Sequence, residues 1–319
     1  MGQERKAALG YDKGKGSKLV RWDKIEAVSR MQRYLKEHAA DEPFCWSDFY
    51  AAAGFSSRHA NRIFKELTQK TPAEYLRDIR LSQSCASVLQ DDKAILDIAL
   101  DAHFDSHEGY TRAFVSRFGR TPSSYRRGEG PVPLFVSDPI KNYYVHLYQK
   151  ESCPMDQKPI VCTVTPIERP QRKLMLQRSV KATDYWSYCE EKCCDWVGML
   201  NSLPGRLDIA AILELPPQLV RLGTSPVAAG VELPMEYGGD VPGGYEIITL
   251  PPCTMLYFQT GPFENEEDFG AQIGAVSQAM QAYQPERFGY AYAPELAPRF
   301  NFGADAANGA KQAVPVRKL

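Results

Sequence analysis

The spacing of apolar residues divides the chain into two parts. Ile25, Val28, Met31 and Leu35 recur at steps of three and four, which places them on one face of a helix. Comparable helical spacing continues to about residue 127. After residue 160, short apolar runs such as "IVCTVTPIE" and "CTMLYFQT" are bounded by Pro and Gly, as β-strands are. The pattern therefore predicts an all-α region followed by an α+β region.

This change of pattern predicts a multidomain chain. We expect a polar, weakly basic arm over 1–22, a helical domain over 23–127, a Pro-rich linker over 128–158 and an α+β domain over 159–319. Within the last domain, "DYWSYCEEKCCDWVGMLNSL" and "NEEDFGAQIGAVSQAMQAY" have helical spacing. The strands and these two helices can be divided into two similar halves.

A small unit occurs twice in the helical domain. "RIFKELTQKTPAEYLR" at 62–77 and "RAFVSRFGRTPSSYRR" at 112–127 share six identical residues at an offset of fifty. In both copies a short helix, a turn and a second helix precede a Thr-Pro pair, and Pro is favoured at the first position of a helix. We therefore predict two helix-turn-helix units joined by one long helix.

The second helix of the first unit has a polar face suited to the DNA major groove. Arg58, Asn61, Arg62 and Lys65 lie at i, i+3, i+4 and i+7. Arg pairs with guanine and Asn with adenine, while Lys and the helix start at Ser57 can hold phosphates. A solvated face is the better interpretation for one such helix alone.

The second copy favours DNA binding over the solvated face. His107, Thr111 and Val115 form one line along its helix, with Glu108 and Arg112 beside them. Two recognition helices about 34 Å apart can enter successive major grooves. A purely structural duplication does not require both copies to keep a polar face that carries Arg.

These residues carry a family resemblance. "GFSSRHANRIFKELTQKTPAEYLRDIRL" and "IALDAHFDSHEGYTRAFVSRFGRTPSSYR" resemble the AraC/XylS-type transcription regulators over about 23–127. The resemblance implies seven helices with two helix-turn-helix units. The positions that it implies face the bases are Arg58, Asn61, Arg62, His107, Glu108, Thr111 and Arg112.

Three further expectations follow for this domain. Acidic Glu108 should reject phosphate and can accept a hydrogen bond from cytosine. The family prefers Gly where this chain has His103, and a left-handed residue other than Gly costs about 1 kcal/mol. The phosphate contacts that we expect come from the arm, the helix start and four basic side chains: Ser57, Lys65, Arg77, Arg117 and Arg126.

Charge and composition narrow the possible partners and the expected location of the protein. Residues 1–21 have a net charge of +4, residues 22–127 of +1 and residues 128–319 of −6, so only the first two segments tolerate a polyanion. No apolar run approaches the length of a membrane span, and the polar start lacks a signal core. With eight Cys in a long chain, we expect reduced thiols and a cytoplasmic protein.

The α+β domain is dense in aromatic residues and has carboxylates at strand ends. Aromatic walls with a buried carboxylate suit an amphipathic cation, whereas core aromatics with solvated carboxylates are the plainer interpretation. "CCDWVGML", "GGYEIITLPPCTMLYFQTGPF" and "GAKQAVPVRKL" resemble gyrase-inhibitor-like (GyrI-like) effector-binding domains. The resemblance implies two strand–helix–strand–strand modules around a cleft. Our candidate effector residues are Trp186, Trp196, Glu214, Glu232 and Tyr257.

Two departures weaken the case for a cation. Some GyrI-like relatives have a key Glu in a late strand, where this chain has Asn301 and Gln312. Glu214 or Glu232 would have to substitute for it, or the ligand is not cationic. Separately, "CEEKCCDW" places Cys189 and Cys193 on one helix face, which suits free thiols better than a metal site because no His lies in this domain.

The sequence thus predicts a DNA-binding transcription regulator without cofactor or metal. A small amphipathic effector would alter how the second domain acts on the first or on a partner such as RNA polymerase. Two alternatives stay open: a constitutive DNA-binding protein whose second domain contacts protein, and a GyrI-like hydrolase fused to a DNA-binding domain. The chain shows no clear catalytic pair.

Overall fold

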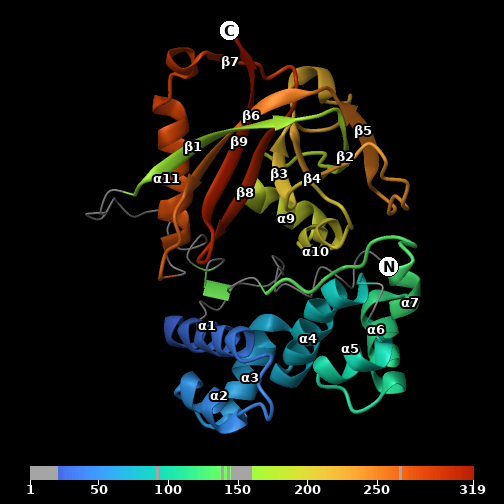
Figure 1. Cartoon of the computed structure of the whole chain (residues 1–319). Helices are drawn as coiled ribbons and strands as arrows, with labels where there is room; N and C mark the ends of the chain where they lie inside the picture. Colours follow the sequence, from blue (N-terminus) through green and yellow to red (C-terminus); the bar gives the residue numbers. More distant parts are fainter. Residues whose placement is uncertain (1–20, 91–92, 138–139, 142–143, 145–159, 266–267) are drawn as a thin grey trace. The chain divides into compact units, whose positions relative to one another are not determined.

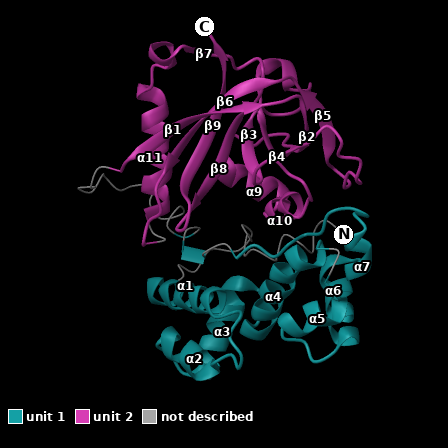
Figure 2. Ribbon diagram, viewed as in Figure 1, with its two compact units in different colours: residues 1–152 teal, residues 153–319 magenta. Residues whose placement is uncertain are grey.

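The computed structural model describes residues 21–90, 93–137, 140–141, 144, 160–265 and 268–319. The chain divides into two compact units, residues 1–152 and 153–319 (Figures 1 and 2). The first is helical and the second is built on a β-sheet, which confirms the expected order of a helical region and a strand-rich region. Of the predicted arm, only Arg21 and Trp22 lie within the described residues.

The first unit contains the duplicated helices. They are α1 (Trp22–Glu37), α2 (Trp46–Ala53), α3 (Ser57–Thr68), α4 (Pro72–Val88), α5 (Ile95–Asp101), α6 (His107–Phe118) and α7 (Pro122–Arg126). The start and the end of α6 each lie fifty residues after those of α3, and α7 starts fifty residues after α4. The offset seen in the sequence is therefore an offset between equivalent helices.

Local chemistry fixes the ends of these helices in both copies. Thr71 caps α4 and Thr121 caps α7, each accepting a hydrogen bond from the N–H three residues later. Gln69 and Gly119, which follow α3 and α6, both have the left-handed backbone that ends a helix, with φ of 60° and 75°. The two copies thus use the same stop and start signals.

Each half of the unit has its own apolar core, and α4 contributes to both. One core gathers buried side chains of α1 to α4, among them Met31, Phe49 and Phe64. The other gathers Tyr110 and Phe114 of α6 with residues of α4, α5 and α7. The long joining helix is therefore packed along its length against both helix-turn-helix units.

The described part of the predicted linker, 128–137, packs within the first unit. Val132 is fully buried in the second of the two cores. The Phe135 ring meets the Tyr75 ring edge-on at 4.6 Å between centroids, and its backbone N–H donates to Ser82 Oγ at 2.6 Å. The Pro-rich pattern marks the end of helical structure here, but the apolar residues between the prolines are still packed against the cores. The rest of the predicted linker lies mostly outside the described residues.

The second unit is an antiparallel sheet with helices and short 3-10 turns. The strand order is β1-β6-β9-β8-β3-β4-β2-β5, and β7 pairs with β9. Its elements are β1 (Cys162–Arg169), β2 (Arg172–Arg178), α9 (Tyr185–Lys192), α10 (Asp195–Asn201), β3 (Ala211–Glu214), η2 (Pro217–Leu219), β4 (Val227–Leu233), β5 (Glu246–Leu250), β6 (Cys253–Thr260), α11 (Phe269–Ala282), η4 (Pro285–Phe288), β7 (Tyr290–Tyr292), β8 (Arg299–Asp305) and β9 (Gly309–Lys318).

Alternation along the strands separates two faces of this sheet. Met175 of β2 and Trp196 of α10 belong to one buried cluster, and Phe258 of β6 packs with Val276 of α11 in another. The side chains next along the same strands, such as Leu174 and Tyr257, form a third cluster. Because successive strand residues point to opposite faces, the helices pack on one face and the third cluster occupies the other.

A carboxylate orders the loop that leaves β2. Glu191 of α9 accepts hydrogen bonds from the Ser179 hydroxyl and from the N–H groups of Val180 and Lys181, at 2.7, 2.8 and 3.0 Å. Burial by itself would raise the pKa of Glu191, but these bonds and Lys192 lower that pKa from 4.5 to about 2. The ionised form is therefore the one that the fold stabilises.

Replacing this carboxylate should make stability less dependent on pH. We expect Glu191→Gln to lower the free energy of unfolding at neutral pH by about 2 kcal/mol, because an amide cannot accept all three bonds as a charge does. The folded-state pKa lies below the ordinary value, so the wild type loses this stabilisation as pH falls from 4.5 toward 2. The difference between the two proteins should shrink over that interval.

Urea unfolding at a series of pH values measures this difference. Glu236→Gln, at an exposed carboxylate of the same unit, is the control and should change little. A difference between wild type and Glu191→Gln that stays constant down to pH 2 would contradict the assignment.

Candidate nucleic-acid interface

Helix α3 presents three basic side chains on its exposed side. Its other side buries Ile63, Phe64 and Leu67, as the apolar spacing predicts. Arg58, Arg62 and Lys65 are exposed. Arg58 and Lys65 make no hydrogen bond or ion pair with the described residues, and Arg62 Nη2 lies 3.1 Å from His59 Nδ1 on the same helix. These three cations are available to a ligand outside the domain.

Helix α6 presents a face of different chemistry. Ser106 caps it by accepting from the Gly109 N–H at 3.1 Å, and Tyr110 and Phe114 are buried beneath it. The exposed positions hold both signs of charge and an apolar residue: His107, Glu108, Arg112 and Val115. Glu108, Arg112 and Val115 stand fifty residues after Arg58, Arg62 and Lys65, so only the Arg62 and Arg112 pair keeps its charge.

Two predicted base-contacting residues are turned partly inward. Asn61 is half-buried and bonds with the Tyr50 hydroxyl of α2, its Nδ2 donating at 3.0 Å. Thr111, its counterpart fifty residues later, has a buried hydroxyl with no hydrogen-bond partner among the described residues. Asn61 thus has a role inside its own helix-turn-helix unit.

The predicted phosphate contacts fall into two groups. Ser57, Lys65 and Arg77 are exposed. Arg117 is half-buried, 3.7 Å from the buried Asp78 carboxylate, and its guanidinium lies over the Phe118 and Phe135 rings.

Arg126 has a similar internal role. It donates to the carbonyls of Val88 and Lys93 at 2.8 and 2.7 Å. Its guanidinium therefore fastens α7 to the end of α4.

Known proteins match the first unit. A family model described as "Helix-turn-helix domain" matches residues 50–128. Transcriptional regulator Rob of Salmonella typhimurium is 41% identical over 119 residues, which are 37% of this chain and 41% of Rob. The match thus spans less than half of Rob.

Regulatory protein SoxS of the same organism is matched over nearly its whole length. It is 30% identical over 101 residues, which are 32% of this chain and 94% of SoxS. The chain belongs to the AraC-type helix-turn-helix regulators.

A solved structure of a transcriptional regulator from Chromobacterium violaceum, one of the AraC-type DNA-binding domain-containing proteins, is 28% identical to this chain. The match covers 33% of this chain and 89% of the solved chain, with a TM-score of 0.28.

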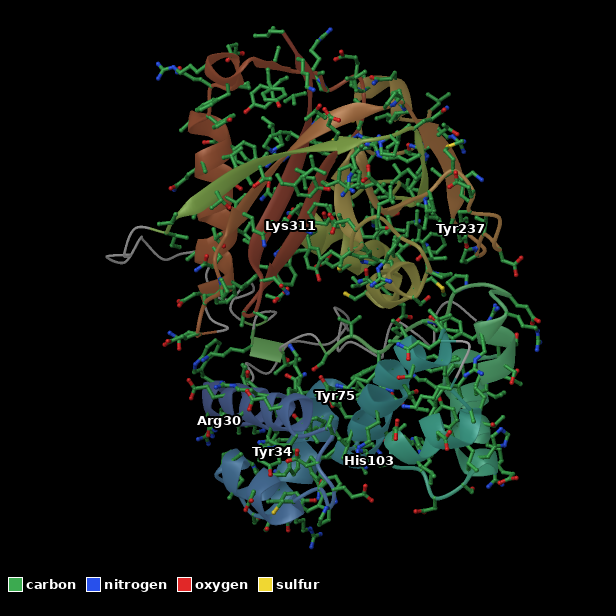
Figure 3. All side chains as sticks on the ribbon, in the orientation of Figure 1. Arg30, Tyr34, Tyr75, His103, Tyr237 and Lys311 are labelled. Carbon is green, nitrogen blue, oxygen red and sulfur yellow. The ribbon has the colours of Figure 1, made fainter. Side chains whose placement is uncertain are left out.

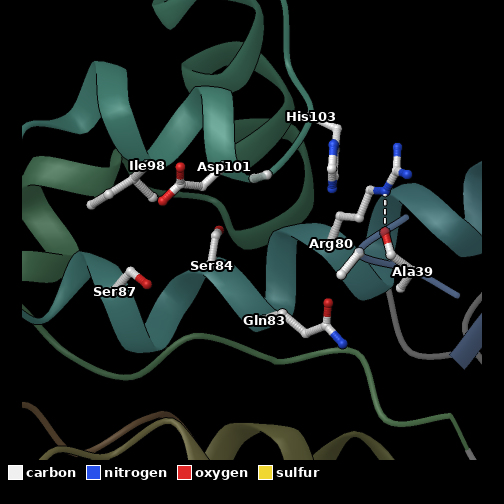
Figure 4. Close-up of a pocket in the computed structure, with 10 residues that line it drawn as sticks. Ala39, Arg80, Gln83, Ser84, Ser87, Ile98, Asp101 and His103 are labelled. Atoms are coloured by element: carbon white, nitrogen blue, oxygen red, sulfur yellow. Dashed lines mark hydrogen bonds between the residues drawn. The ribbon is translucent and has the colours of Figure 1, made fainter. Parts of the chain in front are cut away.

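The two helix-turn-helix units of the AraC-type domain meet around α4. Arg80 of α4 donates to the carbonyls of Ala39 and Asp41 at 2.7 and 3.2 Å, which fastens the end of α1. In the turn of the second helix-turn-helix unit, His103 Nδ1 lies 3.1 Å from Glu42 Oε2. A pocket of about 170 Å³ lies between these groups (Figure 4). These contacts fix the two helix-turn-helix units against one another.

The five predicted effector residues do not form one site. Trp196 is buried in the cluster beneath α9 and α10, and Trp186 lies on α9 with its ring edge-on to Tyr185. Glu214 is exposed at the end of β3, 3.7 Å from Arg299. The structure brings together only Glu232 and Tyr257, which both contact Arg169.

Sequence reasoning missed the residues that surround this pair. Glu232 is ion-paired with the fully buried Arg172, and Lys311 and Asp208 complete the group. Strand alternation in "GAKQAVPV" could have placed Lys311 on the same face as Ala313, and so beside Tyr257. Asn301 and Gln312 lie on the opposite face of the sheet, where Gln312 accepts from Arg299 at 2.6 Å.

Three further observations concern the cysteines, metal-binding groups and membrane-spanning helices. Cys189 is buried, and Cys193 and Cys194 are half-buried. Among the described residues no group of three or more His, Cys, Asp or Glu could hold a metal ion. Nor does the described part of the chain contain a helix long and apolar enough to cross a membrane.

The left-handed turn residue gives a direct test of backbone strain. His103 has φ of 61°, the left-handed value that the family's preference for Gly at this position predicts. We expect His103→Gly to be more stable than His103→Ala by about 1 kcal/mol, because both lose the Glu42 contact and only Ala keeps a Cβ in the left-handed region. Urea unfolding followed by helical circular dichroism measures the difference, and equal stabilities would show that this backbone is unstrained.

The internal role of Arg126 can be separated from that of its neighbour. Arg126→Met should lower the free energy of unfolding by about 1–3 kcal/mol, because two partly buried carbonyls lose a charged donor. Arg127→Met is the matched control, since Arg127 is exposed and contacts only Glu129 in the described part of the chain. It should change stability by less than about 0.5 kcal/mol. Equal losses of stability in the two variants would show that Arg126 does not fasten α7 to the end of α4.

Proposed function

We propose that this chain is a transcription regulator whose AraC-type domain binds double-stranded DNA with sequence specificity. The observation that carries the proposal is the pair of equivalent helices, α3 and α6, each with exposed polar side chains and each held by a buried core on its other side. Family membership supports the same conclusion. Two helices that each enter a major groove would contact adjacent segments of one site.

The two helices would recognise different chemistry. Arg58 and Arg62 of α3 can each donate to guanine in the major groove. On α6, Arg112 can do the same, Glu108 can accept from the cytosine amino group and Val115 can contact a thymine methyl group. Asn61 is committed to Tyr50, so adenine contact by Asn61 would require that bond to break.

Phosphate contacts would come from exposed groups near α3. Lys65 and Arg77 are exposed cations, and Ser57 is the first residue of α3. The N-cap residue of α3, Ser56, makes no side-chain bond to the helix, which leaves the first N–H groups for a phosphate. Arg117 and Arg126 would not contact phosphate, because both are engaged inside the domain.

For the second unit we propose a GyrI-like fold that senses a small molecule. The strand order supports two strand–helix–strand–strand modules, since β2, α9, α10, β3 and β4 have counterparts in β6, α11, β8 and β9, with β3 beside β8 at the centre. A bound effector would change how this unit acts on the AraC-type domain or on a partner such as RNA polymerase.

Selection from a random pool of double-stranded DNA tests the DNA-binding proposal. The full chain should enrich a defined sequence, and binding to it should weaken steeply with salt. Recovery of unrelated sequences, bound no better than random DNA, would reject sequence-specific binding.

Two substitutions on α3 separate base contact from phosphate contact. Arg62→Ala should cost about 1–3 kcal/mol on the selected site and relax specificity at one base pair. Lys65→Ala should weaken selected and random DNA alike and reduce the slope of log affinity against log salt by about 1. Binding titrations at several salt concentrations measure both effects.

Arg126→Met is the control for phosphate contact, measured where the variant is folded. It should leave the salt slope unchanged because its guanidinium faces carbonyls of the domain. If Arg62→Ala and Lys65→Ala have the same effect on selected and random DNA, the assignment of roles on α3 is wrong.

A further inference from the structure

The second unit contains a largely buried group of charged and aromatic side chains that we call the basic cluster: Arg169, Arg172, Asp208, Glu232, Tyr257 and Lys311. Arg172 and Glu232 are almost fully buried and ion-paired. Arg169 Nε lies 3.3 Å from Glu232 Oε2, and Arg169 Nη2 donates to the Tyr257 hydroxyl at 2.5 Å. Lys311 Nζ lies 2.6 Å from Asp208 Oδ1. Figure 3 places Lys311 among the strands of the sheet.

Cations of the chain itself already lie over two aromatic rings here, Tyr257 of the cluster and the neighbouring Phe302 of β8. The Lys311 ammonium lies 4.2 Å from the centre of the Phe302 ring and 5.7 Å from that of Tyr257. The Arg169 guanidinium lies 5.5 Å from the Tyr257 ring centre. A cationic ligand would have to displace the Lys311 and Arg169 side chains from both the rings and the carboxylates. These aromatic and acidic groups would suit a cation if Lys311 and Arg169 were absent, but they do not suit one here.

The balance of charge in the basic cluster is positive. Its three cations face two carboxylates, both of which are shared: Glu232 by Arg172 and Arg169, and Asp208 by Arg169 and Lys311. Arg172 is fully engaged, since it also donates to the carbonyls of Pro170 and Pro251. Arg169 Nε is buried without a hydrogen bond among the described residues. Among the described residues the Lys311 ammonium, which has three N–H donors, donates only to Asp208. Donor capacity therefore remains on Arg169 and Lys311.

We propose that the basic cluster binds an organic anion with an apolar body, with Lys311 and Arg169 as its charged contacts. The cluster is open to solvent at Lys311, whose side chain is 21% exposed, and at Asp208, which is 15% exposed. An incoming carboxylate can replace or join Asp208 at the Lys311 ammonium and the Arg169 guanidinium. Apolar groups of the same face, including Ile167 of β1 and the Phe302 ring beside Lys311, can cover its body.

This inference rests on the proposed sensing role, for which it names the class of ligand. Isothermal titration of the full chain with 2-naphthoate and with 2-naphthylmethylammonium compares two probes of similar shape and opposite charge. The wild type should bind the anion at least about tenfold more tightly, since one favourable charge contact is worth that factor. Equal affinities, tighter binding of the cation or no binding of the anion would overturn the proposal.

Two variants reverse the charge balance in opposite directions. Lys311→Met should weaken the anion about tenfold or more and strengthen the cation, because it frees the Phe302 ring and the Asp208 carboxylate. Asp208→Asn should strengthen the anion, because it removes the carboxylate that competes for the same donors. Lys318→Met, at an exposed cation of the same strand that pairs with Glu168, should leave both affinities unchanged. An unchanged anion affinity in both cluster variants would overturn the proposal.

DNA binding by the same preparations tests the proposed function separately. A loss of anion binding in Lys311→Met with unchanged binding to the selected DNA supports a distinct site in the second unit. Anion binding by a wild type that selects no DNA sequence would support the anion site and reject the regulator. If the chain binds the selected DNA but does not bind the anion, the regulator is supported and the anion site is rejected.

Discussion

A buried carboxylate at the middle of α4 holds the first unit together. Asp78 is 6% exposed, and Lys70, at the turn between α3 and α4, lies 2.7 Å away. Arg117 of α6 approaches from the other helix-turn-helix unit at 3.7 Å, and the Phe135 ring covers both cations. A buried charge is costly unless paired, so Asp78 favours arrangements that keep a cation from each unit beside α4. The spacing of α3 and α6, on which any DNA site would depend, follows from this constraint.

The repeat could be predicted from the sequence because its signals are local. Helix period, Thr-Pro starts and left-handed stops depend on neighbouring residues, and the structure places the helices at the predicted offset. Which polar side chains turn inward could not be predicted. Arg117 and Arg126 are long enough to reach partners on either side of a helix, and their partners, Asp78 and the Val88 and Lys93 carbonyls, are brought near only by packing. Asn61 likewise faces Tyr50, eleven residues away on another helix.

In the second unit the strands were predictable and the site was not. A strand-end Glu in an apolar sequence is compatible with either solvent or a buried partner. Glu214 is exposed, whereas Glu232 is buried because Arg172, sixty residues earlier, lies beside it on the neighbouring strand. Aromatic residues were expected to line one cleft, but strand alternation sends Trp196 and Tyr257 to different clusters. The chain's own cations then decide the chemistry around Tyr257, and their positions depend on strand order, which no single segment of sequence encodes.

The short contact between β3 and β8 has a mechanical consequence for the second unit. These central strands are in register over three residue pairs, whereas β6 and β9 share six and β1 and β6 share eight. Fewer backbone hydrogen bonds therefore resist bending between β3 and β8 than between β6 and its neighbours, so the sheet should bend more easily at its centre than at β6. The apolar packing of Leu213 against Phe300 across these two strands supplies the restoring force.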